Sequence, residues 1–155
     1  MHAAEELRYL ILAAQREGNR LLAQALRPLG LTPAQAEVIR ILSDHQPLTL
    51  NGLGELLVCD SGQSPSRLIG RLVAKGFIER QPSDTDRRAV ELTLTGEGTD
   101  LAEQVTQAED NLYAAISTAL DQQDTRPLAD VLWTLVAGTP AGQALARRAG
   151  KANGH

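Results

Sequence analysis

Apolar residues recur at helical spacing near both ends of the 155-residue chain. In residues 5–26 they alternate between four and three positions apart, and the same spacing returns after Thr95. This heptad-like spacing lines apolar side chains along one helix face, where a second helix can cover them. We therefore predict long terminal helices, and we favour pairing between two chains over packing within one chain. The two series are Leu7, Ile11, Ala14, Gly18, Leu21 and Ala25, then Leu101, Val105, Ala108, Leu112, Ala115 and Ala119.

The ends of these helices are marked by capping and breaking residues. Pro28 and Gly30 are expected to end the first helix, and Thr95 is the expected N-cap of the second, with Glu97 in its first turn. Apolar spacing predicts a further helix over about residues 124–137. One more short helix is expected after Pro140.

Residues 31–76 are predicted to hold three short helices with helix-turn-helix spacing. Thr32 as N-cap and Pro33 as the first helical residue begin the first, which the segment HQPLTL ends. The segment LNGLGELLV, residues 50–58, is expected to be the second. The third covers SPSRLIGRLVAKG and is closed by Gly76.

Two starts are open for the third helix. If Ser64 is the N-cap, Pro65 lies in the first turn, where proline is well accommodated. If the helix begins at Ser61, Pro65 removes the first intrahelical hydrogen-bond donor. The choice affects the roles of Ser61, Gln63 and Ser64.

The third predicted helix has one apolar and one polar face. Leu68, Ile69, Leu72 and Val73 share the apolar face, and the opposite face carries Gln63, Arg67, Gly70, Arg71 and Ala74. Amide and guanidinium groups separated by small residues suit insertion into a DNA major groove, because arginine bonds guanine and glutamine bonds adenine. An ordinary amphipathic surface helix would show the same division, so the neighbouring segments decide between these interpretations.

A β-hairpin is expected directly after this helix. The segments FIERQ and AVELTL, residues 77–81 and 89–94, are strand-like, and the loop PSDTDRR between them is long and polar. A basic loop after a candidate recognition helix is typical of a wing. Arg87 and Arg88 would lie at its tip, where the negative potential of a minor groove attracts arginine. Asp86 is expected to hold the Arg88 side chain by an ion pair.

The charge is uneven along the chain, which has a net charge of −4. Residues 64–88 carry six basic and three acidic side chains, whereas the segments before and after them are acidic. A positive segment in an acidic chain indicates a polyanionic partner at one surface. On charge alone, we favour a solvated charged face over a polyanion-binding surface.

The sequence offers little to an enzyme, a metal site or a membrane protein. Catalytic and nucleotide-binding motifs are missing, His2, His45 and His155 are scattered, and Cys59 is the only cysteine. No apolar run approaches the roughly 20 residues that span a bilayer. The N-terminus lacks the basic region of a signal peptide. We expect a cytoplasmic protein that is not an enzyme and needs no cofactor and no metal.

Two segments give the chain a resemblance to the MarR family of winged-helix transcription regulators. SRLIGRLVAKGFIER, residues 66–80, is similar to the family's recognition-helix segment, and DRRAVELTLTGEG, residues 86–98, matches its wing motif. The resemblance covers roughly residues 7–135, including GLTPAQAEVIRIL at residues 30–42. The redox-sensing branch of the family uses a cysteine in or near the first helix, and this chain has none there. We interpret Cys59, in the helix-turn-helix turn, as a small buried residue.

The resemblance implies a mainly α fold with a small β-hairpin wing (α+β). A winged helix-turn-helix core at residues 31–94 would be flanked by N- and C-terminal dimerisation helices at residues 1–30 and 95–149, all in a single domain over residues 1–155. It also implies a homodimer that binds double-stranded DNA at pseudo-palindromic operators, commonly modulated by small anionic, often aromatic, molecules. We expect a ligand-responsive repressor, with a cleft for the ligand between the dimer helices and the winged part. The effector and its binding residues are unknown.

We assign DNA contacts to the third helix and to the wing. Arg67 is expected to reach base edges and Arg88 the minor groove, while Arg71, Lys75 and Arg87 mainly meet phosphates. The full set is Gln63, Ser64, Ser66, Arg67, Arg71, Lys75, Asp86, Arg87 and Arg88. The alternative is a winged-helix protein-interaction module, in which the same cations dock an acidic partner.

Overall fold

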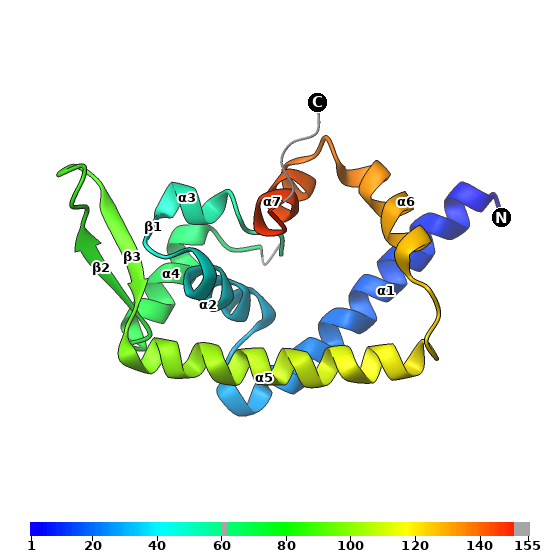
Figure 1. Cartoon of the computed structure of the whole chain (residues 1–155), viewed down its shortest axis with the longest axis horizontal. Helices are drawn as coiled ribbons and strands as arrows, with labels where there is room; N and C mark the ends of the chain where they lie inside the picture. Colours follow the sequence, from blue (N-terminus) through cyan, green and yellow to red (C-terminus); the bar gives the residue numbers. More distant parts are fainter. Residues whose placement is uncertain (60–61, 151–155) are drawn as a thin grey trace.

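Figure 1 shows a winged core at one end of the molecule, with long helices running away from it. The computed structural model describes residues 1–59 and 62–150. The helices around the core are α1 (Ala3–Leu26), α5 (Gly96–Ala119), α6 (Arg126–Val136) and α7 (Pro140–Arg148). The core holds the 3-10 helix η1 (Arg27–Leu29), α2 (Pro33–His45), β1 (Leu48–Thr49), α3 (Leu50–Gly54), α4 (Pro65–Ala74), β2 (Ile78–Pro82) and β3 (Val90–Leu94). This mainly helical architecture with a small sheet confirms the predicted fold class.

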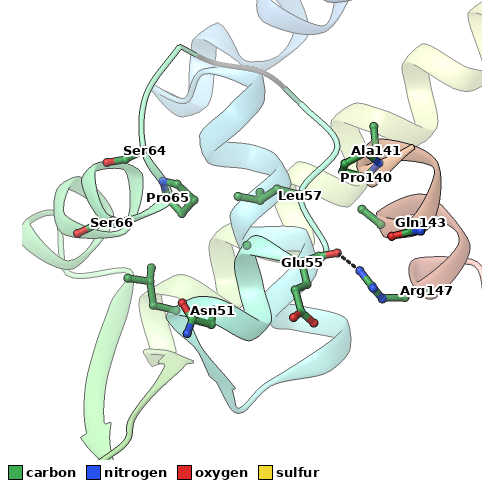
Figure 2. A pocket seen from close by; sticks show the side chains of 13 residues that line it. Asn51, Glu55, Leu57, Ser64, Pro65, Ser66, Pro140, Ala141, Gln143 and Arg147 are labelled. Carbon is green, nitrogen blue, oxygen red and sulfur yellow. Dashed lines mark hydrogen bonds between the residues drawn. The ribbon is translucent and has the colours of Figure 1, made fainter. Parts of the chain in front are cut away.

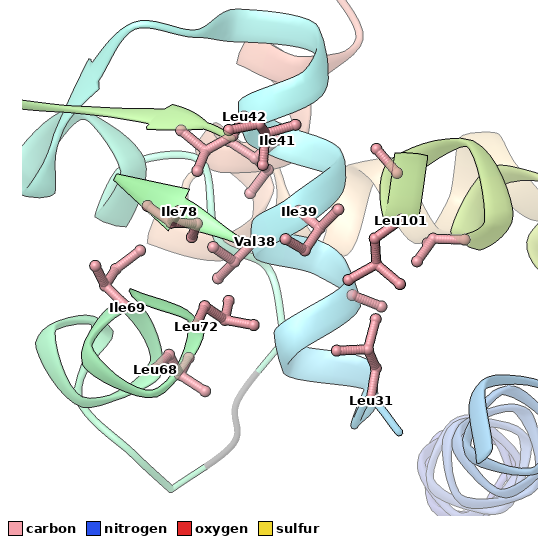
Figure 3. Close-up of a cluster of buried hydrophobic side chains, with 14 of the residues drawn as sticks. Leu31, Val38, Ile39, Ile41, Leu42, Leu68, Ile69, Leu72, Ile78 and Leu101 are labelled. Carbon is pink, nitrogen blue, oxygen red and sulfur yellow. The ribbon is translucent and has the colours of Figure 1, made fainter. Parts of the chain in front are cut away.

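Helix α2 lies in the middle of the hydrophobic core (Figure 3). It begins at the predicted start signal, because Thr32 and Gln35 form a reciprocal capping box. Thr32 Oγ1 accepts from the Gln35 backbone N–H at 3.3 Å, and Gln35 Oε1 accepts from the Thr32 N–H at 3.1 Å. Val38 faces the α4 side of the core, and Ile39 faces Leu101 of α5. Packing on both sides buries most of α2, so this helix fixes α4 relative to α5.

Three strands of the described chain form one antiparallel sheet in the order β1-β3-β2. In the hairpin Ile78 pairs with Leu94, and the pairing continues to Pro82 opposite Val90. Leu94 is buried, whereas Val90 is exposed, because the hairpin runs beyond the core toward the wing tip. The sequence predicted only the hairpin. Strand β1 is an addition, in which two residues of the segment expected merely to end α2 pair with β3.

Helix α3 is shorter than predicted. It ends at Gly54, whereas the apolar run suggested a helix over residues 50–58. The backbone N–H groups of Val58 and Cys59 donate to the Glu37 carboxylate of α2, at 2.8 and 2.9 Å. A helix continuing through these residues would use the same donors internally. The carboxylate therefore competes with the helix for its backbone donors.

Helix α5 is joined to the end of α4 by a compact junction. Thr95 caps α5 by accepting from the Gly98 N–H at 3.0 Å, and its hydroxyl donates to the Gly76 carbonyl at 2.6 Å. The Thr95 backbone N–H donates to the Phe77 carbonyl at 3.1 Å. A side chain at Gly98 would place its Cβ only 2.0 Å from that carbonyl oxygen. The spacing Thr95-x-x-Gly98 thus ties the long helix to the turn that follows α4.

The terminal helices expose much of their apolar surface. The α5 series is buried at Leu101 and Val105, but it is exposed from Ala115 onward. Large exposed apolar side chains continue on α1 and α6, at Tyr9, Leu10, Ile11, Leu12, Leu128, Val131 and Leu135. The predicted apolar faces are therefore present, and within one chain they are only partly covered. Among the described residues, no helix combines the length and the apolar character that crossing a membrane requires.

Candidate nucleic-acid interface

Helix α4 begins at Pro65 with Ser64 as its N-cap. The Ser64 hydroxyl oxygen accepts from the Arg67 backbone N–H at 3.3 Å. Proline at the first helical position lacks only a donor that would have no intrahelical partner there. Of the two starts left open by the sequence, the structure therefore has the one at Ser64. Ser61, the other candidate, lies outside the described residues.

The two faces of α4 are divided as predicted. Leu68, Ile69 and Leu72 are buried in the core, with at most 4% of their surface exposed. Arg67 and Arg71 are exposed on the opposite side. At about 100° per residue, the Arg67 side chain points away from the mean direction of Leu68, Ile69 and Leu72. It therefore lies near the middle of the exposed face. A side chain there meets whatever approaches the helix first.

Arg71 and three other assigned residues lie around this exposed face. Gln63 and Arg71 border a hollow of about 290 Å³ on the side of α4 that faces the start of α2. Ser66 borders a groove on the other side, between α4, α3 and α7. Lys75, the C-cap of α4, donates its ammonium to the Gly30 carbonyl at 3.3 Å. In this conformation one N–H of the Lys75 ammonium is bonded to the loop before α2, and the same group has two further donors with which it can meet a phosphate.

The wing is ordered by hydrogen bonds around Ser83. This serine is buried, and its hydroxyl donates to Glu91 Oε1 at 2.8 Å. The same oxygen accepts from the N–H groups of Thr85 and Asp86, at 3.3 Å each. The loop is closed by the Ser83 N–H, which donates to the Ala89 carbonyl at 3.0 Å. Sequence reasoning missed both Ser83 and Glu91, although a serine followed by Asp-Thr-Asp is a recognisable loop-forming signal.

Asp86 supports Arg88 in a different way from the one expected. Asp86 Oδ1 accepts from the Arg88 backbone N–H at 3.0 Å, whereas an ion pair with the guanidinium was predicted. Asp86 therefore shapes the turn, and the exposed side chains of Arg87 and Arg88 leave the wing without that restraint. Figure 1 shows this wing projecting at the end of the molecule that also carries α4. The fold thus brings α4, which carries Arg67, and the loop between β2 and β3, which carries Arg87 and Arg88, to one end of the molecule.

A groove separates α4 and α3 from the C-terminal helix α7. It has a volume of about 730 Å³ and is open to solvent (Figure 2). The Arg147 guanidinium crosses to the α3 side and donates to the Glu55 carbonyl at 3.0 Å. A second cleft of about 430 Å³ lies where α1, α2, α5 and α7 meet, and Leu22, Glu37, Tyr113 and Arg148 are among its lining residues. This second cleft has the position expected from the sequence, between the long helices and the winged part.

Cys59 differs from the prediction, because the residue is exposed. Its sulfur is nevertheless poorly solvated. Desolvation, together with the neighbouring Glu37 carboxylate, raises the pKa of the Cys59 thiol to about 12. A thiol with such a pKa stays protonated near neutral pH and is a poor nucleophile.

Comparison with known proteins finds transcription regulators, among them members of the MarR family. A sequence model described as MarR family matches residues 29–89. The organic hydroperoxide resistance transcriptional regulator of Bacillus subtilis is 28% identical over 136 residues, covering 88% of this chain and 90% of the relative. The multiple antibiotic resistance protein MarR of Escherichia coli is 36% identical over 95 residues, covering 61% of this chain and 65% of the relative.

A solved structure extends the similarity over nearly the whole fold. It contains a mutant of Escherichia coli MarR complexed with operator DNA, and it superposes with a TM-score of 0.75 at 30% identity. The match covers 84% of this chain and 94% of the MarR chain. Proteins of this family are transcription regulators and not enzymes, so the prediction that the chain is not an enzyme is confirmed. With the winged helix-turn-helix architecture, these similarities establish that the chain belongs to the MarR family of DNA-binding transcription regulators.

Proposed function

We propose that the chain is a sequence-specific repressor that binds a pseudo-palindromic operator as a homodimer and is released by a small ligand. The observation that carries this proposal is the exposed face of α4. Arg67 lies in its middle, opposite the buried Leu68 and Leu72, and the wing with Arg88 is at the same end of the molecule. A major-groove helix beside a minor-groove arginine suits B-DNA, whose two grooves are adjacent.

Each cation has a distinct proposed role. Arg67 contacts base edges in the major groove, and Arg88 enters the minor groove from the wing. Arg71, Lys75 and Arg87 neutralise phosphates, with Lys75 donating to a phosphate oxygen through an N–H other than the one bonded to Gly30. Gln63, Ser64 and Ser66 complete the contact surface at the start of α4, and Asp86 acts through the shape of the wing.

The homodimer rests on the uncovered apolar faces of the terminal helices. Val131 and Leu135 of α6 are 50% and 55% exposed, and Leu10 of α1 is 59% exposed. Large contiguous apolar surface on a soluble regulator marks an association site. We assign residues 1–30 and 95–149 to dimerisation and residues 31–94 to DNA binding, within one domain. A two-fold axis between two reading helices matches a pseudo-palindromic operator.

The cleft of about 430 Å³ is the candidate ligand site because of its position, where the long helices α1 and α5 meet α2 of the winged part. It lies between the proposed dimerisation part and the DNA-binding part. A small anionic or aromatic effector there would alter how the two parts meet. Screening phenolic acids and common metabolites against the protein–operator complex tests this element. If no compound in the screen changes operator affinity, release by a small ligand is no longer part of the proposal.

The reading of DNA is tested by comparing two arginines of the same helix. Operator is obtained as the site that the wild-type protein selects from a random DNA library. Arg67→Ala should cost about 1–3 kcal/mol on operator and relax preference at one position per half-site. Arg71→Ala should weaken operator and random DNA alike and reduce the salt slope by about 1 per lost phosphate contact.

Arg16→Ala provides the control for charge, because it removes the same charge from an exposed position on α1. Since α1 belongs to the part assigned to dimerisation, light scattering of this variant must first find the same oligomeric state as the wild type. Affinities are measured on operator and random DNA at two salt concentrations for all three variants. If Arg67→Ala loses affinity equally on operator and random DNA, Arg67 does not contact base edges. If the wild-type protein selected no site at all, the alternative interpretation, docking of an acidic protein, would take precedence.

A further inference from the structure

The buried carboxylate of Glu37 joins three parts of the fold that are distant in sequence. Glu37 lies on α2 and exposes only 6% of its surface. Its Oε1 accepts from the Val58 backbone N–H at 2.8 Å, and its Oε2 accepts from the Cys59 N–H at 2.9 Å. The Arg148 guanidinium of α7 bonds Oε1 at 2.6 Å. Both carboxylate oxygens are therefore engaged, from two directions.

The two backbone donors lie in the segment that leads into the recognition helix. Val58 and Cys59 follow α3, and α4 begins at Pro65. A carboxylate that accepts two successive N–H groups restrains the path of the chain there. The position of Val58 and Cys59 relative to α2 thus depends on where the Glu37 side chain stands.

Arg148 compensates the charge of Glu37. A buried carboxylate is costly unless it is paired and hydrogen-bonded, and removing one partner of such a pair leaves the other charge uncompensated. Within the described residues, Arg148 is the cation that forms an ion pair with Glu37. Without Arg148, turning toward solvent would lower the free energy of the Glu37 carboxylate. That movement would break its hydrogen bonds with the Val58 and Cys59 N–H groups.

Helix α7 is joined to α6 by a compact turn. Thr139 caps α7 and donates its hydroxyl to the Val136 carbonyl at 2.7 Å. A Cβ at Gly142 would lie 1.9 Å from the same carbonyl oxygen, so the two helices meet in close backbone contact. Beside Arg148, Arg147 bonds the Glu55 carbonyl at the end of α3. Helix α7 therefore holds the helix-turn-helix segment at two points.

We propose that Glu37 is a positioning residue for the recognition helix and that Arg148 of the C-terminal helix holds it in place. This inference rests on the proposed reading of DNA by α4. In this arrangement core packing on α2 places α4, and α7 steadies the segment that leads into α4, although neither Glu37 nor Arg148 touches DNA. Specific binding depends on the pose of α4 more than non-specific binding does, because base contacts need alignment and phosphate attraction does not.

The first test measures operator and random-DNA affinity for Arg148→Ala, Arg148→Lys, Glu37→Gln and the double variant Glu37→Gln/Arg148→Ala. Arg148→Ala and Glu37→Gln should each weaken operator binding by about 5- to 30-fold, as expected for a coupled contact. Random-DNA binding should change by less than about 3-fold, the scale of one lost surface charge. Arg148→Lys should restore most of the operator affinity, because it keeps the charge.

The double variant distinguishes positioning from a general loss of stability. If Arg148 acts through Glu37, the double variant loses no more than the stronger single variant, whereas independent effects would multiply. Arg16→Ala is the control for charge, light scattering shows whether each variant keeps the oligomeric state of the wild type, and melting temperatures show which variants remain folded. Multiplied losses, or equal losses on operator and random DNA, would overturn the proposal. Wild-type operator affinity in Arg148→Ala would overturn it as well.

The second test does not involve DNA. Amide hydrogen exchange at Val58 and Cys59, followed by NMR, should be faster in Arg148→Ala than in the wild type and nearly normal in Arg148→Lys. Unchanged exchange in a folded Arg148→Ala protein would refute the role of Arg148. This measurement also separates the two proposals. If amide exchange is faster in Arg148→Ala but Arg67→Ala leaves operator affinity unchanged, the proposed reading of DNA by α4 is wrong. The proposed role of the contact between Arg148 and Glu37 would still stand.

Discussion

Replacing Gly98 by alanine should destabilise the protein strongly, although alanine is the better helix former. The added Cβ would lie 2.0 Å from the Phe77 carbonyl oxygen and 3.0 Å from its carbonyl carbon. Carbon and oxygen atoms that are not bonded rarely approach within about 3 Å, so backbone atoms must separate by roughly 1 Å. The nearest atoms are backbone atoms of Phe77 in the junction between α4 and α5, so the clash cannot be relieved by rotating a side chain.

The expected cost follows from two terms. Overpacking of this kind costs typically about 1–3 kcal/mol. Moving the Phe77 carbonyl also weakens its hydrogen bond from the Thr95 N–H, for about 1 kcal/mol more. We therefore expect Gly98→Ala to lower the free energy of unfolding by about 2–4 kcal/mol, or to lower the melting temperature by roughly 5–15 °C.

Gly96→Ala is the matched control, since Gly96 is two residues earlier in the same helix and no atom lies within 4 Å of a Cβ placed there. It should be neutral or stabilising by up to about 1 kcal/mol, because alanine restricts the unfolded chain. Both variants are compared by urea unfolding at one protein concentration, since association contributes to apparent stability. A Gly98→Ala protein as stable as Gly96→Ala would refute the argument from close approach.

Three further predictions concern the cap of α4, the apolar face of α6 and the thiol. Ser64→Ala removes the acceptor for the Arg67 N–H and should cost about 1 kcal/mol in thermal or urea unfolding, whereas an intact stability would show that the cap is dispensable. Val131→Glu places a charge in the proposed dimer face, so light scattering should find monomer, and a persistent dimer would place the interface elsewhere. With its pKa raised to about 12, the Cys59 thiol should react with iodoacetamide far more slowly than a free cysteine at pH 8. The same shift favours the protonated thiol in the folded state, so its contribution to stability should be lost as pH rises from about 9 toward 12, an effect that Cys59→Ser removes.

The helices were predictable because their signals are local. Apolar spacing identified α1, α5 and α6, and caps such as Thr32 and Thr95 marked helix starts within a few residues of the bonds that they make. Both features operate over one or two turns, so a short stretch of sequence contains all the information. The two faces of α4 followed for the same reason. The winged helix-turn-helix order came from the succession of these elements and from the resemblance of two segments to the MarR family.

Elements that depend on distant partners could not be predicted in this way. Strand β1 has only two residues, too few for a periodic pattern, and it exists because β3 offers it an open edge. Helix α3 ends early because Glu37, 21 positions before Val58, accepts the backbone donors that a longer helix would use. The bond from Lys75 to the Gly30 carbonyl spans 45 positions, and no local rule implies it.

The candidate DNA interface divides in the same way. The sequence by itself determined which side chains α4 exposes, because burial of Leu68, Ile69 and Leu72 leaves Arg67 on the other side whatever surrounds the helix. The tertiary structure decided how the interface is supported, through the Ser83 hydroxyl in the wing and the α7 contact with Glu37. A helical period encodes which face is apolar. A contact between Glu37 and Arg148, 111 positions apart, depends on the paths of all the elements between them, and only the folded chain specifies those paths.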